Sequence, residues 1–322
     1  MGNLTVALIG GQGYGNTLGK KGTSTDITLY NVKRGEDTVT FIEPTRHPER
    51  LAPLFYAVSL SKKAVIVVDE LNATLGECLV MLQCVNIAEG FFILRNFVTR
   101  DKIQPLIRGT SLENFEFVED NPMLLREKLL TQAAEHTVAS EQCTKSSGTV
   151  PVDHSFNVKG VGAVVLGIVA DGEISKHDNV RVLPGAKTTQ VRSIQKHDDE
   201  FDCAHKGDRV GLAVKNLEVE DLERGTVLTT DATIKSTKTV KTQAALIKYW
   251  QAPMKTEMVV HLGHWMQFIP ARVDGIFDEG DWHKPTLTLS LEKDLVYRPG
   301  DRAVVSHLEG GKLRVAGTLQ LP

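Results

Sequence analysis

Short apolar runs alternate with amphipathic stretches over roughly the first 137 residues. The apolar runs, rich in Val, Ile and Phe, are typical of buried strands and lie at residues 4–9, 39–42, 64–68 and 91–94. Apolar residues at helical spacing predict helices over residues 48–60, 75–85 and 122–136. Asn121 is placed to cap the last helix, and Pro122 suits its first position. Because strands alternate with helices, we expect a mainly parallel sheet covered on both faces.

One strand of this region departs from the parallel pattern. Residues 25–30 alternate in polarity like a strand, and the run Lys33-Arg-Gly-Glu-Asp37 precedes the strand at 39–42. A short connection of this kind joins antiparallel strands, so we expect a hairpin here.

The helical signals stop near residue 138. Residues 137–148 are polar and rich in Ser and Thr, which is typical of a linker. Short strands separated by turn residues follow and predict a small closed barrel; they lie at residues 162–170, 179–183, 189–195, 209–214 and 226–229. A second polar connection, over 231–242, leads to another strand-only segment. We therefore divide the chain into an α/β domain at 1–137 and two strand-built domains at 138–232 and 233–322.

Composition and cysteine content place the chain among ordinary globular proteins. Its 322 residues correspond to about two domains, and 41% are hydrophobic and 24% charged. It has no run of 18 apolar residues and no basic leader at its start, so we expect no membrane partner and no secretory signal. Four cysteines, of which only Cys78 and Cys84 are close in sequence, fit neither a disulfide framework nor a zinc knuckle. We expect reduced thiols in a cytoplasmic protein.

A glycine-rich loop follows the first predicted strand, where a phosphate-binding loop would lie. It reads Gly10-Gly-Gln-Gly-Tyr-Gly-Asn-Thr-Leu-Gly-Lys-Lys21. A P-loop needs four residues between its glycines, then Lys and a hydroxyl residue, so that these groups converge on phosphate and magnesium. Here three residues separate Gly15 from Gly19, and Lys21 follows Lys20 where the hydroxyl belongs. The dinucleotide pattern lacks its third glycine. We expect a loop without a phosphate-holding nest of amides.

Two histidine-containing segments raise the question of a metal site. His197-Asp-Asp-Glu-Phe-Asp-Cys-Ala-His205 alternates in polarity within a predicted barrel loop, and we interpret it as a solvated acidic turn. His261 and His264 lie three apart in a strand region without a third ligand. The chain also lacks a nucleophile elbow and a reactive-cysteine signature. We therefore predict no metal and no catalytic residue.

Longer stretches of the chain resemble a known family. The run Pro151-Val-Asp-His-Ser-Phe-Asn-Val-Lys-Gly, continuing to Gly167, is similar to the opening of the second domain of translational elongation GTPases. The similarity continues through Asp171-Gly-Glu-Ile, residues 191–197, Gly207-Asp-Arg-Val-Gly-Leu and Glu223-Arg-Gly-Thr-Val-Leu. Tyr297-Arg-Pro-Gly-Asp-Arg302 and Glu309-Gly-Gly-Lys-Leu-Arg-Val-Ala-Gly317 resemble the close of the third domain. Within the family the chain most resembles the selenocysteine-specific elongation factor and its archaeal paralogues. The resemblance implies a G-domain-like parallel sheet followed by two β-barrels.

The first domain departs from this family at each nucleotide-handling motif. The P-loop fails as described above. Glu43-Pro-Thr-Arg-His47 stands where the family has Asp-x-Pro-Gly-His, so Arg46 replaces the glycine whose amide would sense the γ-phosphate. Arg95-Asn-Phe-Val98 stands where Asn-Lys-x-Asp would recognise guanine. Together the three departures predict a pseudo-GTPase domain without cofactor. The alternative is that Gly15, Gly19, Lys20 and Lys21 bind GTP with magnesium in an unconventional way.

The second domain retains residues suited to an aminoacyl group. The family resemblance implies that Asp153 and His154, after the first Pro-Val, and Arg209, in the Gly-Asp-Arg turn, surround a selenocysteinyl group. A selenol is largely ionised near neutral pH, and guanidinium and imidazole donors favour a compact anion. The alternative is structural: Asp153 and His154 satisfy turn backbone groups while Arg209 makes an ion pair within the domain. We expect the three residues to converge in one small pocket.

Charge distribution bears on the partner. The whole chain carries a net charge of −3, which excludes a polycationic nucleic-acid binder. The segment 233–322 nevertheless carries +3, including Lys248, Lys255, Arg272, Lys284, Arg298 and Arg302. Basic residues gathered on one barrel face would bind phosphates in a salt-sensitive way, whereas scattered ones would only aid solubility.

Three functional hypotheses remain open at this stage. The first is an elongation-factor-like binding protein that holds an aminoacyl-tRNA or another RNA, with the ribosome as a further partner and no DNA. The second is an active GTPase with non-standard motifs. The third is a protein adaptor at the ribosome that binds no tRNA. The sequence leaves the oligomeric state undetermined.

Overall fold

The computed structural model describes residues 2–135, 143–144, 146–197 and 199–322. Its contacts divide the chain into two compact units. The first unit comprises residues 1–138 together with the segment Ser306–Gly317, and the second comprises residues 139–305 and 318–322. Each unit is described below by itself.

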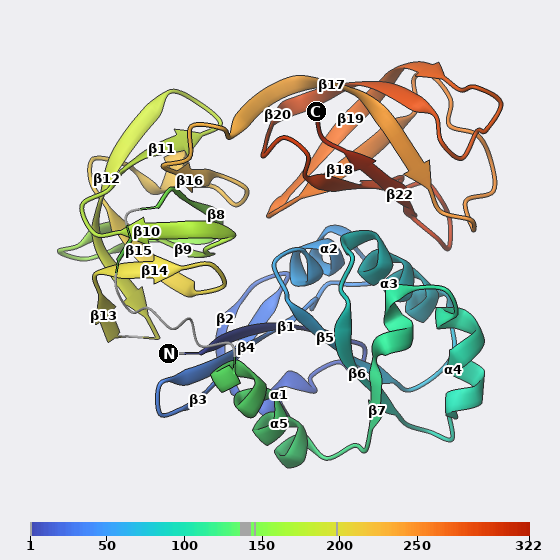
Figure 1. Ribbon diagram of the computed structural model, residues 1–322, viewed down its shortest axis with the longest axis horizontal. Coiled ribbons are helices and arrows are strands. Elements are labelled where there is room, and N and C mark those ends of the chain that lie inside the picture. The colour runs from blue at the N-terminus through green and yellow to red at the C-terminus, as the bar shows by residue number, and fades with distance from the viewer. Residues whose placement is uncertain (1, 136–142, 145, 198) are drawn as a thin grey trace. The chain divides into compact units, whose positions relative to one another are not determined.

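A seven-stranded sheet forms the centre of the first unit, in the order β2-β3-β4-β1-β5-β6-β7 (Figure 1). Its strands are β1 (Asn3–Ile9), β2 (Lys20–Ser24), β3 (Thr28–Arg34), β4 (Asp37–Glu43), β5 (Lys63–Val68), β6 (Glu89–Leu94) and β7 (Glu116–Val118). β4, β1, β5, β6 and β7 run parallel, whereas β2, β3 and β4 pair antiparallel. Both the expected parallel sheet and the expected hairpin are therefore confirmed, with the first hairpin strand shifted to β3.

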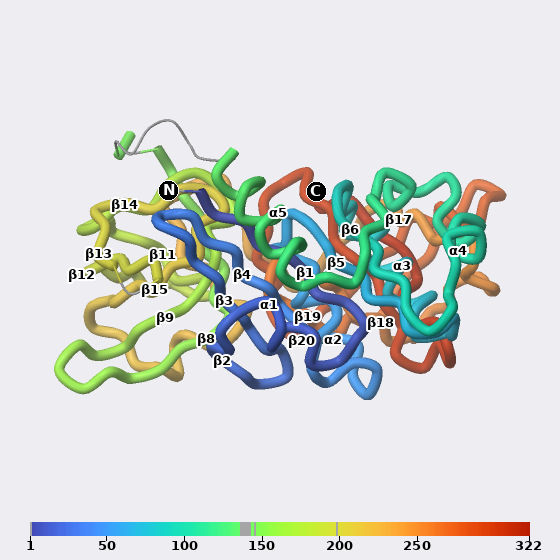
Figure 2. Tube along the Cα trace, turned by 90° about the horizontal axis from the view of Figure 1, so that it is seen from below, coloured from blue at the N-terminus to red at the C-terminus, as the bar shows by residue number. Residues whose placement is uncertain are grey.

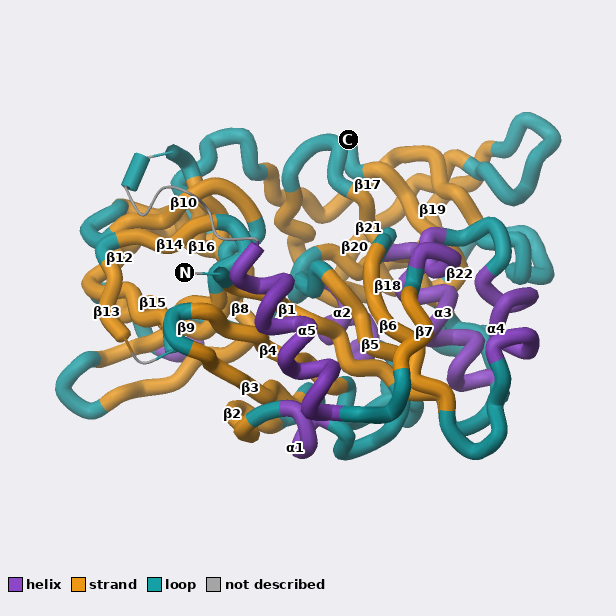
Figure 3. Tube along the Cα trace, turned by 60° about the horizontal axis from the view of Figure 1, so that its bottom comes forward, coloured by secondary structure: helices purple, strands orange, loops and turns teal. Residues whose placement is uncertain are grey.

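Helices cover both faces of this sheet. They are α1 (Gly15–Leu18), α2 (Ala52–Ser59), α3 (Ala73–Val85), α4 (Arg100–Ile107) and α5 (Pro122–Glu135). α1 and α5 lie together on one face, while α2 and α3 lie on the other (Figures 1 and 3). β2 and β7 are the edge strands of the sheet, and α4 lies at the end opposite β2 (Figure 2).

The three predicted helices are confirmed, and α1 and α4 were not predicted. α4 buries two apolar side chains, those of Ile103 and Ile107, and contains Pro105. So few apolar positions leave almost no helical signal in the sequence. α1 is a single turn and is equally inconspicuous.

The second unit contains two closed barrels. The first barrel is the ring β8-β16-β11-β12-β15-β9, closed by pairing of β9 with β8. Its strands are β8 (Gly148–Val158), β9 (Gly162–Ile168), β11 (Asn179–Leu183), β12 (Lys187–Lys196), β15 (Arg209–Val214) and β16 (Val227–Thr229). The short strands β10 (Asp171–Ser175), β13 (Asp199–Phe201) and β14 (Cys203–His205) extend it. Inward-facing Val, Leu and Ile side chains fill the ring.

The second barrel follows the order β17-β20-β19-β18-β21-β22. Its strands are β17 (Lys235–Leu246), β18 (Val259–His264), β19 (Gln267–Phe277), β20 (Thr286–Tyr297), β21 (Arg302–Ser306) and β22 (Val315–Gln320). The polar connection predicted over 231–242 is therefore wrong in large part, because β17 begins at Lys235. The outward-facing Lys and Thr residues of β17 conceal its strand character from a hydrophobicity pattern.

The two barrels contact each other through an apolar cluster and an ion-pair network. Leu183 and Val227 of the first barrel pack with Ile234 and Val296. The Arg298 guanidinium lies 2.9 Å from a carboxylate oxygen of Asp171 and 3.5 Å from one of Asp231. These contacts join the barrels into one unit.

The cysteine expectation is wrong for one pair. A disulfide joins Cys143 to Cys203, 60 residues further along the chain, while Cys78 and Cys84 are free and buried. Sequence distance hid this pair, because the barrel fold is what brings β14 beside residue 143. Among the described residues, none of the helices is both long and apolar enough to cross a membrane.

We predict opposite effects for two glycine substitutions in the first domain. A Cβ atom at Gly90 would lie 2.2 Å from the Ala64 carbonyl oxygen and 2.3 Å from the Phe115 ring, whereas one at Gly76 in α3 meets nothing within 4 Å. Gly90→Ala should lower the free energy of unfolding by about 1–3 kcal/mol through overpacking. Gly76→Ala should raise it by about 0.5–1 kcal/mol.

Urea unfolding followed by helical circular dichroism measures both variants. The α-helices of the described chain lie in the first unit, so this signal reports that unit (Figure 3). A Gly90→Ala variant as stable as the natural protein would contradict the packing described for Gly90.

Candidate functional site

The glycine loop of the first domain closes on itself. The amide of Tyr14 donates to the Gly11 carbonyl at 2.8 Å, and the amide of Asn16 donates to the Gly13 carbonyl at 3.1 Å. α1 is one turn long, and Gly19 continues directly into β2. The structure therefore lacks, in this described loop, the long helix whose N-terminus would hold a phosphate.

A buried carboxylate occupies the inner side of this loop. Glu43, at the end of β4, accepts a hydrogen bond of 2.5 Å from the Gly13 amide and one of 2.9 Å from the Tyr30 hydroxyl. Glu43 is 5% exposed. Burial, together with the bond to Glu43, raises the pKa of Tyr30 to about 12. The loop amide that would face a phosphate thus faces a protein carboxylate, which repels anions.

The predicted nucleotide-binding residues of the first domain are dispersed. Gly15 packs against the Tyr30 ring, which a Cβ atom would meet at 2.2 Å. A Cβ atom at Gly19 would lie 2.8 Å from the Asn31 carbonyl oxygen. Lys20 and Lys21 are exposed neighbours on the edge strand β2, so their side chains point to opposite faces of the sheet. The two amines cannot converge on one phosphate without rearrangement of β2.

The segment Arg95-Asn-Phe-Val98, which stands where the family has its guanine-recognition motif, makes contacts within the protein. Arg95 donates to Asp120 at 2.7 Å, the Tyr14 hydroxyl donates to the same carboxylate at 2.9 Å, and the guanidinium lies 4.9 Å from the Tyr14 ring centre. Burial and the Asp120 carboxylate raise the pKa of Tyr14. Asn96 and Phe97 adopt left-handed backbone conformations, and Phe97 is 97% exposed.

His47, which stands at the family's histidine position, is buried in an ion-pair network. Its Nε2 lies 3.0 Å from Glu77, and both side chains are more than nine-tenths buried. Arg314, in the segment 306–317 of the same unit, donates to Glu77 from its backbone amide at 3.0 Å and from Nε at 2.9 Å. Burial would raise the pKa of Glu77, but the bonds from His47 and Arg314 outweigh it and lower the pKa to about 2. His47 is thereby fixed against α3. Nothing in the sequence pattern indicated this partnership.

The structure brings Asp153, His154 and Arg209 together in the second domain. Asp153 occupies a bulge of β8, where the pairing with β9 shifts register between Val152 and His154. A bulge of this kind re-aims a side chain, and here the carboxylate meets the guanidinium of Arg209 on β15 in a bidentate ion pair. The Nδ1 atom of His154 lies 2.6 Å from the same carboxylate.

Electrostatics hold this cluster in its charged form. Burial would raise the pKa of Asp153, but the Arg209 charge and the hydrogen bonds from His154 and Arg209 hold it well below its usual range. Because an ionised carboxylate only accepts hydrogen bonds, His154 carries its proton on Nδ1. The geometry thus includes the intradomain ion pair of the structural alternative, and the role of the three residues in binding stays a prediction.

Arg224 joins the cluster and was not among the predicted residues. Its Nε donates to the Asp153 carbonyl at 3.1 Å, and its Nη2 lies 3.5 Å from Nε2 of His154. Arg224 lies in the run Glu223-Arg-Gly-Thr-Val-Leu, whose family resemblance was the available signal. Arg224 thus brings a second guanidinium group to Asp153 and His154. Guanidinium groups can attract an anionic group.

The basic residues of the segment 233–322 differ in their surroundings: some are paired with carboxylates and others are exposed. Arg298 is paired with carboxylates between the barrels, and Arg272 lies 2.9 Å from Asp274 and 3.5 Å from Glu257. Lys255, Lys284 and Arg302 are exposed. Some of the basic side chains of this segment therefore form ion pairs within the protein.

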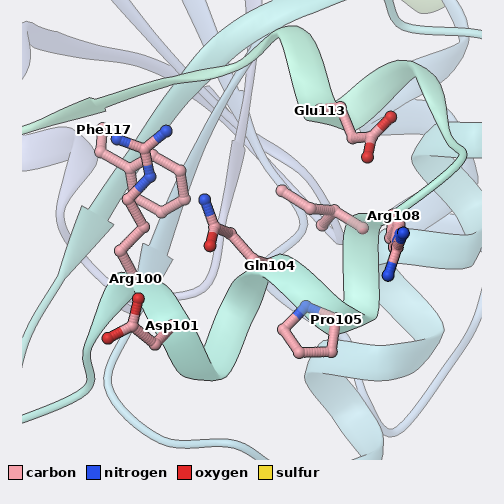
Figure 4. A pocket seen from close by; sticks show the side chains of 8 residues that line it. Arg100, Asp101, Gln104, Pro105, Arg108, Glu113 and Phe117 are labelled. Atoms are coloured by element: carbon pink, nitrogen blue, oxygen red, sulfur yellow. The ribbon is translucent and has the colours of Figure 1, made fainter.

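A groove at the edge of the first unit has a volume of about 650 Å³ (Figure 4). Arg100 of α4 lies with its guanidinium 4.9 Å from the Phe117 ring centre, and Gln104 projects beside them. Arg108 and Glu113 lie at its other end. The lining begins at Arg100, two residues after the segment Arg95-Asn-Phe-Val98.

The acidic segment 197–205 is more structured than expected. The interpretation as a solvated turn is wrong for its end, because Cys203, Ala204 and His205 form β14 and Cys203 is 6% exposed. His264 is 4% exposed and lies 3.1 Å from both the Val296 carbonyl and the Asp301 carboxylate, which explains it as a buried structural histidine.

Comparisons with known proteins agree with this architecture. The family model for Elongation factor Tu domain 2 matches residues 162–229. An uncharacterized protein of Methanocaldococcus jannaschii is 36% identical over 323 residues, which span the whole of both chains. The selenocysteine-specific elongation factor of the same organism is 25% identical over 274 residues, 79% of this chain and 58% of its own length. The chain thus spans little more than half of that relative.

A solved structure shares the fold. Translation elongation factor SelB from Methanococcus maripaludis, in complex with the GTP analogue GppNHp, superposes with a TM-score of 0.80 at 22% sequence identity. The match covers all of this chain and 79% of that one. An apo form of the same protein gives a TM-score of 0.78.

The Glu77 network predicts a pH-dependent contribution to stability. The folded-state pKa of about 2 lies below the ordinary value of 4.5, so ionised Glu77 stabilises the fold above pH 4.5 and this contribution is lost as the pH falls toward 2. Glu77→Gln should therefore be less stable than the natural protein near neutral pH, and the difference should shrink on acidification.

Urea unfolding at several pH values, followed by helical circular dichroism, checks this expectation. Glu127→Gln is the control, because Glu127 forms a half-exposed ion pair with Arg34 and such pairs contribute about 0–1 kcal/mol. A stability difference for Glu77→Gln that is constant with pH would contradict the network.

Proposed function

Because the chain belongs to the translational elongation factor family, among proteins similar to the selenocysteine-specific elongation factor, we propose that it binds an aminoacyl-tRNA or a related RNA through its two barrels. In this proposal its first domain is a pseudo-GTPase that positions the barrels without hydrolysing nucleotide. The ribosome is a further partner, the cytoplasm is the location, and DNA is not a ligand.

The cluster of Asp153, His154, Arg209 and Arg224 carries the proposal. Two guanidinium groups and an imidazole surround one carboxylate at a strand bulge, and the His154 and Arg209 side chains are each 11% exposed. A small anion beside these side chains would receive charge-assisted hydrogen bonds. An ionised selenol on an aminoacyl end is a compact anion of this kind. A seryl group has an uncharged and smaller oxygen at the same position.

The contacts of the first domain support the pseudo-GTPase assignment. The Gly13 amide is bound by Glu43, and His47 is bound by Glu77. In a GTPase, a loop amide such as that of Gly13 binds the phosphate, and a histidine such as His47 lies beside the attacking water. Binding of GTP would require displacement of the buried Glu43 carboxylate, which loses the Gly13 and Tyr30 bonds. The resulting cost opposes nucleotide binding.

We predict no magnesium-dependent affinity of the full chain for GTP. Isothermal titration with GTP and with a non-hydrolysable analogue, each with and without Mg²⁺, measures this directly. Glu43→Gln is a matched variant, because it removes the negative charge beside the loop while keeping an acceptor for the Gly13 amide. Magnesium-dependent GTP binding by the natural protein would favour an active GTPase with non-standard motifs. The same binding by Glu43→Gln alone would identify Glu43 as the barrier.

We predict that Arg224→Gln weakens binding of selenocysteinyl-tRNA about tenfold or more, as expected for loss of a charge-assisted hydrogen bond. Binding of the same tRNA carrying serine should change far less. Arg192→Gln is the control, because Arg192 is an exposed arginine of the same barrel outside the cluster. It should change the affinities for the two aminoacyl forms equally, and by no more than the loss of one phosphate contact.

Filter-binding titrations of the full chain at low and at physiological salt measure these affinities. Equal affinity for the two aminoacyl forms would overturn the role of the cluster. Absence of tRNA binding at low salt would overturn the RNA proposal and favour a protein adaptor.

A further inference from the structure

Two cysteines, a glutamate and a histidine meet at the outer strands of the first barrel, outside the Asp153 cluster. The sulfurs of Cys143 and Cys203 and a carboxylate oxygen of Glu173 all lie within 4.8 Å of one another. The His205 ring lies beside them, with Nδ1 3.5 Å from Glu173 and Nε2 3.8 Å from the Cys203 sulfur. We call these four residues the thiol cluster.

The strand pairing explains why these side chains share one face. β10 and β14 are antiparallel, and Glu173 lies directly opposite His205. Cys203 and His205 are two residues apart on β14, so both side chains point to the same side of the strand. Cys143 reaches this face from outside the sheet, and its Cα lies 5.8 Å from that of Cys203.

Glu173 is held in place by polar neighbours. It is 1% exposed, and its Oε2 accepts hydrogen bonds of 2.9 Å from both the amide and the hydroxyl of Thr144. The Ser175 hydroxyl donates to its Oε1 at 3.0 Å. Hydrogen bonds of this kind orient the first ligands of protein metal sites.

We propose that the thiol cluster, with its two cysteines reduced, is a Zn²⁺ site. Two thiolates, one imidazole and one carboxylate make a four-ligand set of the type that tetrahedral zinc prefers. Thiolate ligands select zinc over magnesium or calcium. The three negatively charged ligands and the two positive charges of the ion leave a net charge of −1 at the site.

The disulfide and the metal are alternative states of the same residues. A dithiol reductant opens the disulfide: its own two sulfurs become a disulfide, and Cys143 and Cys203 receive two electrons and two protons. Zinc binding then releases the two thiol protons to solvent as two Zn–S bonds form. The sulfurs must separate to about 3.7 Å, the distance set by two ~2.3 Å Zn–S bonds at a tetrahedral angle. Rotation of the exposed Cys143 side chain supplies this movement.

Metal analysis of the reduced full-length protein tests the site. The protein is reduced with a phosphine, incubated with Zn²⁺ and desalted without oxygen, and we expect one zinc per chain. The oxidised protein should retain none. Substitution by Co²⁺ should give the thiolate-to-cobalt charge-transfer band and the intense visible bands of tetrahedral coordination. Zinc content and the cobalt spectrum do not depend on tRNA or nucleotide binding. A failure of the zinc proposal can therefore be distinguished from a failure of the proposed function.

Variants separate this cluster from other thiols. Cys143→Ser should abolish stoichiometric zinc binding and the charge-transfer band attributable to two thiolates, and it leaves the buried barrel residues untouched. Glu173→Gln should weaken zinc binding at least tenfold. Cys84→Ser, which alters a buried thiol of the first unit, should retain one zinc per chain.

Two results would overturn the proposal. One is a reduced natural protein that retains no zinc after desalting, which would make the pair a disulfide alone. The other is full zinc binding by Cys143→Ser, which would place the metal elsewhere.

Discussion

The Glu43 carboxylate at the inner side of the glycine loop organises the structure of this part of the first domain. It accepts hydrogen bonds from the Gly13 amide and the Tyr30 hydroxyl, and Tyr30 in turn packs against Gly15. The loop, the one-turn helix α1 and the edge strand β2 are all arranged around this contact. Glu43 stands where the family has an aspartate, and its carboxylate reaches the loop amide itself. A buried carboxylate of the protein thus occupies the inner side of the loop.

Both candidate regions repeat one physical device, a buried carboxylate saturated by cations. Glu77 binds Arg314 and lies beside His47, and Asp153 binds Arg209 and lies beside His154. Removing one partner of such a group leaves an uncompensated buried charge, which is strongly destabilising. Each network therefore holds its side chains in one arrangement. In the first domain this rigidity immobilises a histidine, whereas in the second it presents two arginines near the surface.

Much of the fold could be predicted from the pattern of apolar residues. The parallel strands β1, β4, β5 and β6 are continuous apolar runs because both faces of the sheet are buried, and such runs are easily found. β17 and α4 were missed because most of their residues face water, so their sequences read as polar connections. β8 was missed as a strand for a related reason: its second half carries polar side chains, and a bulge interrupts its alternation.

The site residues could be predicted only where they lie in a sequence motif that resembles the family. Asp153, His154 and Arg209 followed from family resemblance, and their meeting depends on strand pairs that a sequence does not display. Arg224, Arg314 and the Cys143–Cys203 pair belong to contacts between segments 60 or more residues apart. No local spacing rule reaches that far, since each contact is created by barrel closure or by docking of a distant segment.

Arg298 has a consequence for recognition. It binds both Asp171 and Asp231, and the apolar cluster of Leu183, Val227, Ile234 and Val296 also joins the two barrels. For the RNA ligand proposed above, barrels that are already joined reduce the conformational entropy that the protein loses on binding. In that proposal the distance between the barrels would help to select ligands by their length as well as by their charge.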